Sequence, residues 1–101
     1  MTQEEALYQA RMLSETERKI LLLCRSNEPS HYAEMAREIG EIYKNVQTAG
    51  RRLQALKLAR IGLTVRPSIY RNRAGEYAGS ALFLTDLGVS VRLASVRLMN
   101  G

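Results

Sequence analysis

The feature that most constrains the fold is a glycine, Gly40, that separates two stretches of helical periodicity. Apolar residues recur in residues 32–39 and again in residues 41–58 at the three- and four-residue spacing that gives a helix one buried side. Glycine adopts the left-handed conformation that ends a helix without strain. We therefore expect two helices joined by a tight turn. Their predicted inward residues are Met35, Ala36 and Ile39 in the first helix, and Ile42, Val46, Ala49, Leu53 and Leu56 in the second.

This helix pair contains the three residues that a helix-turn-helix requires. Ala36 is small enough for the helices to cross closely, Gly40 forms the turn, and Val46 anchors the second helix in a core. The spacing alone also fits an ordinary helical hairpin. A second glycine, Gly50, lies inside the second helix, where it costs about 1 kcal/mol relative to alanine. It indicates either a close backbone approach or a bend.

The rest of the chain supplies further helices on both sides and two short strands. A capping-box pattern from Ser14 to Glu17 predicts the start of a helix that runs to about Arg25. Residues 63–66 and 81–84 have the composition of strands. With 101 residues and no linker or repeat, we expect one domain, residues 1–101. Its predicted class is mainly α with a small β-wing, in the order α-α-α-β-β-α after a short N-terminal helix.

Downstream of the helix pair, three features occur together. The second helix has a leucine-rich exit, a basic ribbon follows, and the segment Leu84–Gly88 reads Leu-Thr-x-x-Gly. In these features residues 14–92 resemble the winged helix-turn-helix DNA-binding proteins, most closely MarR-type transcriptional regulators. The leucines of the exit are Leu53, Leu56 and Leu58.

The resemblance implies a division of the chain and a mode of binding. The winged-helix core would occupy residues 14–84, between an N-terminal helix in residues 1–12 and a C-terminal helix, residues 85–99, that could serve dimerisation. The recognition helix, residues 41–58, would enter the DNA major groove. The basic wing, residues 62–84, would lie on the minor groove or the backbone.

The charge of +5 is unevenly distributed along the chain. Residues 1–41 contain five basic and eight acidic side chains, a net charge of −3, whereas residues 42–101 contain ten basic and two acidic ones, a net charge of +8. Basic residues that neutralise phosphates release condensed counterions, so this bias favours a polyanionic partner. An ordinary solvated basic surface is the alternative.

The side chains that could contact DNA lie on the second helix and on the wing. Arginine and lysine pair with guanine edges or phosphates, and glutamine or asparagine can bond an adenine edge twice. Arginine at a wing tip can enter a narrow minor groove. Both sets also fit the solvated face of a helix and a polar hairpin tip. The candidates are Tyr43, Lys44, Asn45, Gln47, Thr48, Arg51 and Arg52 on the helix, and Arg66, Arg71, Asn72 and Arg73 on the wing.

Other classes of function find little support in the sequence. The single cysteine, Cys24, allows no internal disulfide and no metal-ligand set; we expect it in the core, since redox sensing needs exposure and a lowered pKa. The lone His31 lacks the partners of a catalytic base, so we expect it at the surface or capping a helix. No apolar run approaches the roughly 20 residues of a membrane span. We predict a cytoplasmic, non-enzymatic protein without metal or cofactor and away from membranes.

Together these features predict a sequence-specific transcriptional regulator that binds double-stranded DNA as a homodimer. Two alternatives stay open. One is a protein–protein assembly module whose basic helix meets an acidic partner. The other is an RNA-binding domain or a component of a phage or plasmid replication or packaging complex. The homodimer is inferred from the C-terminal helix, with Val89, Leu93, Val96 and Met99, and from a stripe formed by Leu7 and Leu13.

Overall fold

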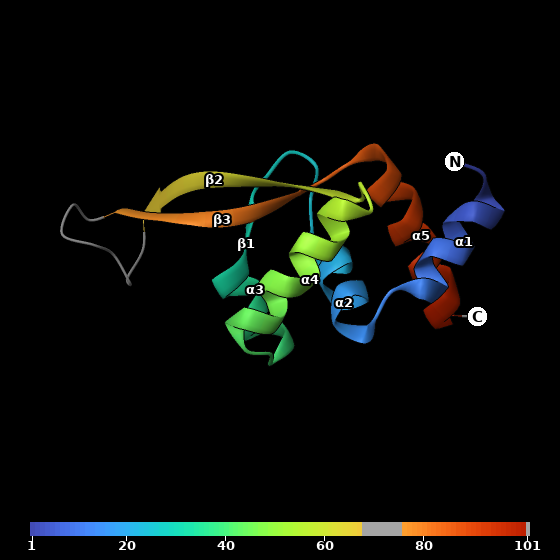
Figure 1. Ribbon diagram of the computed structural model, residues 1–101, viewed down its shortest axis with the longest axis horizontal. Coiled ribbons are helices and arrows are strands. Elements are labelled where there is room, and N and C mark those ends of the chain that lie inside the picture. The colour runs from blue at the N-terminus through green and yellow to red at the C-terminus, as the bar shows by residue number, and fades with distance from the viewer. Residues whose placement is uncertain (68–75, 101) are drawn as a thin grey trace.

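The computed structural model describes residues 1–67 and 76–100, with side chains described for residues 1–62 and 81–100. Within these residues the chain is mainly helical with a small β-sheet, as predicted, and the sheet is antiparallel and has three strands (Figure 1). The helices gather at one end, and a two-stranded ribbon extends away from them (Figure 1). In chain order the elements are α1 (Gln3–Met12), α2 (Glu15–Leu23), β1 (Ser30–His31), α3 (Tyr32–Ile39), α4 (Tyr43–Ala55), β2 (Ala59–Pro67), β3 (Glu76–Leu84) and α5 (Asp86–Asn100).

Local hydrogen bonds fix the ends of the early helices where the sequence predicted them. Ser14 Oγ accepts from the Glu17 backbone N at 3.1 Å, and Glu17 Oε1 accepts from the Ser14 backbone N at 3.0 Å, which completes the capping box of α2. Gly40 ends α3 in the left-handed conformation with φ 70°, and the Glu41 N–H closes the turn onto the Ala36 carbonyl at 2.9 Å. The predicted tight turn between α3 and α4 is confirmed.

α4 is shorter than the predicted helix of residues 41–58 at both ends. Ile42 has an extended backbone before the helix and is 62% exposed, so the prediction that it faces the core is wrong. At the other end Lys57 adopts a positive φ of 64°, which turns Leu58 into the core and starts the ribbon. The inward stripe between these ends is as predicted, with Val46, Ala49 and Leu53 buried and Leu56 partly buried against the core.

The sheet has the strand order β1-β3-β2. β2 and β3 pair along nine residues each, from Ala59↔Leu84 to Pro67↔Glu76, so the ribbon is longer than the two predicted strands. β1 was not predicted, because two residues have no periodicity of their own; it pairs Ser30 with Leu82. The order of elements therefore gains a strand between the second and third helices.

α1 and α5 lie side by side at the end of the molecule opposite the tip of the ribbon (Figure 1). Small residues line their contact, which lets the two helices approach closely: Ala6 and Ala10 from α1 are buried, as are Ala94 and Ser95 from α5. Leu13 is also buried and Leu7 packs against the core, so the prediction that these two leucines form a dimer stripe is wrong.

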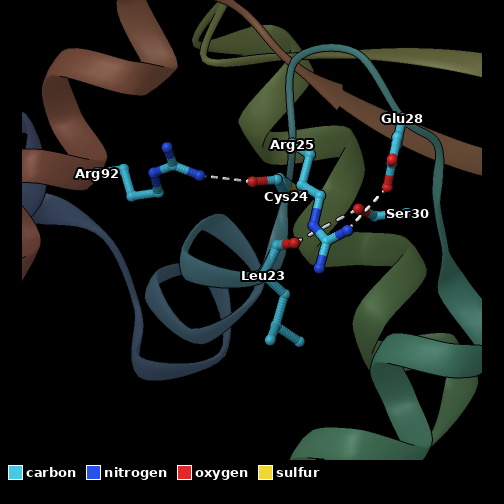
Figure 2. Close-up of polar contacts among 6 residues, drawn as sticks. All are labelled: Leu23, Cys24, Arg25, Glu28, Ser30 and Arg92. Carbon is cyan, nitrogen blue, oxygen red and sulfur yellow. Dashed lines mark hydrogen bonds and ion pairs between the residues drawn. The ribbon is translucent and has the colours of Figure 1, made fainter.

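The chain segment after α2 is bound by three separate elements. Ser30 Oγ of β1 donates to the Leu23 carbonyl at 3.5 Å, and Arg92 of α5 donates to the Cys24 carbonyl at 2.7 Å (Figure 2). The next carbonyl, of Arg25, accepts from the Leu84 N–H of β3 at 2.8 Å. α2 ends at Leu23, two residues before the predicted end, because the backbone of Cys24 is extended. The carbonyls that the helix end leaves without helical partners are bound by these elements instead. At the surface Arg25 also pairs with Glu28 at 2.7 Å (Figure 2).

Two residues that could suggest chemistry are part of the core. Burial raises the pKa of Cys24 to about 12, so its thiol stays protonated at neutral pH. Cys24 is a core residue, as predicted, without the exposure or low pKa of a redox sensor. His31 was predicted at the surface or as a cap. It is the N-cap residue of α3, but its side chain makes no capping hydrogen bond and is buried, so the surface alternative is wrong. Its pairing with Ala81 of β3 draws it into the sheet.

Candidate nucleic-acid interface

One side of α4 is buried and the opposite side presents polar and basic groups. Lys44, Thr48 and Arg51 are exposed, and their spacing of four and then three residues places them along one line of the helix. No acidic residue occurs in the first turn of α4. The structure therefore brings the predicted helix candidates to one surface. Of the others, Tyr43, Asn45 and Arg52 are exposed and Gln47 is half-buried.

Gly50 lets α4 pack tightly against α3 on the buried side. A Cβ at this position would lie 2.6 Å from Tyr32 Oη and 2.7 Å from Tyr32 Cε1, so the tyrosine ring occupies the space of a side chain. Of the two interpretations of Gly50, close approach is correct. The Tyr32 ring also meets the Tyr43 ring edge-on, with 6.0 Å between centroids. This packing holds the buried side of α4 in place against α3.

Tyr32 supports α4 from the core as an uncharged side chain. Its hydroxyl is buried and has no hydrogen-bond partner among the residues that the structure describes. Burial raises the pKa of Tyr32 to about 12, so the ring stays neutral. A neutral ring held in the core positions α4 without placing a charge behind the exposed face.

A carboxylate lies immediately before α4, where the sequence analysis singled out only Asn45. Glu41 Oε1 accepts from Asn45 Nδ2 at 2.8 Å and from the Ile42 backbone N at 3.1 Å. These bonds, first that from Asn45, lower the pKa of Glu41, so the carboxyl is ionised at neutral pH. The predicted two-bond contact of Asn45 with adenine is thus in competition with Glu41. The feature of the sequence that could have predicted this bond is the four-residue spacing of Glu41 and Asn45 across the start of the helix.

The ribbon carries a basic group that the sequence analysis did not select. Arg60 is exposed at the base of β2, and its guanidinium carbon lies 4.5 Å from the centroid of the Phe83 ring on β3. This cation–π contact favours a position of the guanidinium over the ring. Among the predicted wing residues, Arg66 has its backbone in β2 opposite Tyr77, while its side chain lies outside the described set. Arg71, Asn72 and Arg73 lie outside the described residues.

Acidic and basic side chains are separated along this part of the chain. Residues 42–62 contain five basic side chains and no acidic one, and all five are exposed. The exposed acidic residues Glu34 and Glu38 lie on α3, before the turn. α4 and the base of the ribbon therefore form a continuous cationic part of the chain. Its basic residues are Lys44, Arg51, Arg52, Lys57 and Arg60.

Other kinds of site are not evident in the described part of the chain. There, no group of three or more histidine, cysteine, aspartate or glutamate side chains could hold a metal ion. None of the helices in residues 1–67 and 76–100 is long and apolar enough to cross a membrane. Comparisons with protein-family models, with curated proteins and with solved structures give no match to this chain.

Proposed function

We propose that this chain is a winged-helix, sequence-specific regulator of the cytoplasm that binds double-stranded DNA. α4 is the recognition helix in the major groove, and the β2–β3 ribbon is the wing on the minor groove or the backbone. One observation carries this proposal: α4 is packed from behind by Tyr32, while Lys44, Thr48 and Arg51 face outward from it without an acidic neighbour on the helix. A rigid helix with such a face suits direct readout of base edges.

The dimensions and neighbours of α4 favour duplex DNA. Its 13 residues span about 20 Å, and a single helix fits a major groove about 12 Å wide. The ribbon begins three residues after the helix ends, so a ligand that contacts α4 is also within reach of cations on the ribbon. Two basic elements that follow one another in the chain suit a duplex, whose phosphates line both edges of a groove.

The proposal is tested by the salt dependence of binding to random duplex DNA, measured by fluorescence anisotropy. With four or five phosphates neutralised, the logarithm of the association constant should fall against the logarithm of salt with a slope of about −4. No binding at low salt would refute DNA recognition and favour a protein-assembly module. Tighter binding to duplex RNA of the same sequence would favour the RNA alternative.

The regulator is proposed to act as a homodimer through α5. Large apolar side chains of this helix stay exposed: Leu93 is 53% exposed and Val96 37% exposed, whereas Val91, Ala94 and Ser95 are buried. Val89, Leu93 and Val96 follow one another at four- and three-residue spacing, which makes one continuous apolar strip. A two-fold contact would cover the strip of one copy with that of the other and provide two α4 helices for two half-sites.

Leu93→Glu is expected to convert the dimer to a monomer, because it would bury two charges without partners at the two-fold contact. Leu87→Glu is the matched control: Leu87 is 37% exposed on the same helix, but about 120° around it from Leu93. Sedimentation equilibrium at tens of micromolar separates the two states. A wild-type monomer at that concentration would contradict the dimer, as would an unchanged mass for Leu93→Glu.

A further inference from the structure

We propose that Glu41 determines base specificity, by accepting a hydrogen bond from the exocyclic amino group of a base in the major groove, with cytosine N4 as the preferred donor. This inference rests on the proposed function of α4 as a recognition helix. Glu41 is the last residue but one before that helix, and residues at the N-terminal end of a recognition helix reach base edges.

The Glu41 carboxylate is held in place while part of it stays available. Both hydrogen bonds in the turn, from Asn45 Nδ2 and from the Ile42 backbone N, go to the same oxygen, Oε1. A carboxylate has about four acceptor positions on its two oxygens, so Oε2 can accept from a donor outside the chain. The two bonds to Oε1, one from the backbone and one from the Asn45 side chain, orient the carboxylate and leave Oε2 as an acceptor with a preferred direction.

The charge of Glu41 selects among bases. A carboxylate near DNA is repelled by phosphates, so general affinity gains nothing from it. Its ionised form can only accept hydrogen bonds, and the donors exposed in the major groove are cytosine N4 and adenine N6. Guanine presents two acceptors, O6 and N7, and adenine places the N7 acceptor beside its N6. Repulsion from N7 therefore ranks cytosine above adenine and both above guanine.

Nearby side chains on α4 complement this preference. Lys44 and Arg51 are donors suited to guanine O6 and N7, and they lie on the exposed face that follows Glu41. An acceptor at the start of the helix and donors along it would read different bases at successive positions. Glu41 thus recognises a hydrogen-bond donor on a nucleobase, which lysine and arginine cannot do because they have no acceptor.

The test is a selection of bound duplexes from a random pool, carried out with the wild type, Glu41→Ala, Glu41→Gln and Glu38→Gln. The wild type should enrich cytosine at one position of each half-site by roughly tenfold or more over guanine. Glu41→Ala should lose the preference at that position alone. Glu41→Gln should move it toward adenine, since an amide bonds adenine N6 and N7 together.

Glu38→Gln is the matched control, because it removes the same charge from an exposed residue of α3 and should leave every preference unchanged. Circular dichroism establishes that each variant folds. Enrichment of adenine in place of cytosine, lost in Glu41→Ala, would keep the proposal and identify N6 as the donor. Preferences that persist in Glu41→Ala, or a wild type that binds without any preference, would overturn it. A wild type that binds no duplex would instead refute the proposed function itself.

Discussion

Replacing Gly88 with alanine is expected to destabilise the protein by about 3 kcal/mol or more, although the same change in an exposed helix would stabilise it by about 1 kcal/mol. Gly88 lies in the first turn of α5 and is buried. A Cβ there would overlap the carbonyl oxygen of Leu58 and lie 2.7 Å from Leu84 Cδ1. Overlap with backbone cannot be relieved by rotating a side chain, so steric repulsion outweighs helix propensity.

The surrounding hydrogen bonds explain why the backbone cannot move aside. Thr85 Oγ1 donates to the Lys57 carbonyl at 2.7 Å and accepts from the Gly88 N–H at 3.0 Å. The Thr85 N–H donates to the Leu58 carbonyl at 3.2 Å. The start of α5 is thereby tied to the turn between α4 and β2. An added methyl group would separate these parts and break at least one hydrogen bond, a further loss of about 1 kcal/mol.

Urea unfolding followed by circular dichroism would measure the loss for Gly88→Ala. Ser90→Ala is the control in the same helix, since Ser90 is only half-buried, and it should change the free energy of unfolding by no more than about 0.5 kcal/mol. Equal stability of Gly88→Ala and the wild type would show that the junction between Leu58 and α5 is looser than the structure indicates.

Features of the fold that depend on a few neighbouring residues could be predicted from the sequence. The capping box at Ser14 and the left-handed turn at Gly40 each act within about four residues, and both are present. The inward stripe of α4 follows equally from periodicity. Each of these features depends only on residues within its own segment, so it can be predicted without knowing how the rest of the chain folds.

The predictions from the sequence are wrong where contacts between segments far apart in the chain determine the structure. β1 forms because Ser30 pairs with Leu82, some fifty residues later in the chain. The two residues of β1 contain no local pattern that predicts this pairing. His31 is drawn into the interior by the same strand. Leu7 and Leu13 face the core because small residues let α1 and α5 approach closely, which the identity of the leucines alone does not reveal.

The candidate site, too, was predicted from the sequence only in part. The exposed side of α4 follows from helical periodicity, so Lys44, Thr48 and Arg51 lie where the sequence predicted. Arg60 was missed because its restraint comes from Phe83 on the neighbouring strand, and strand register was not known. Glu41 was not selected for the site because DNA phosphates repel a carboxylate, although its four-residue spacing to Asn45 is local.

The double substitution Lys44→Ala with Arg51→Ala is expected to weaken specific DNA binding by about 100-fold or more. Each side chain is proposed to contact a base edge or a phosphate, and a good base contact contributes about 1–3 kcal/mol to discrimination. Both residues are exposed, so the variant should keep its fold. Anisotropy titrations with a selected duplex and with random duplex at one salt concentration measure the two losses separately.

The control pair is Arg11→Ala with Arg25→Ala, which removes the same charge from an exposed residue of α1 and from one that follows α2. If only long-range attraction mattered, the two double variants would lose affinity equally, because the net charge falls by two in each. Contact of α4 with DNA requires the Lys44 and Arg51 pair to lose far more, and more on the selected than on the random duplex. A salt slope that falls by about 1 for each lost phosphate contact would distinguish phosphate binding from base readout. Equal losses for the two pairs would place the interface away from α4 and favour a protein partner for its basic face.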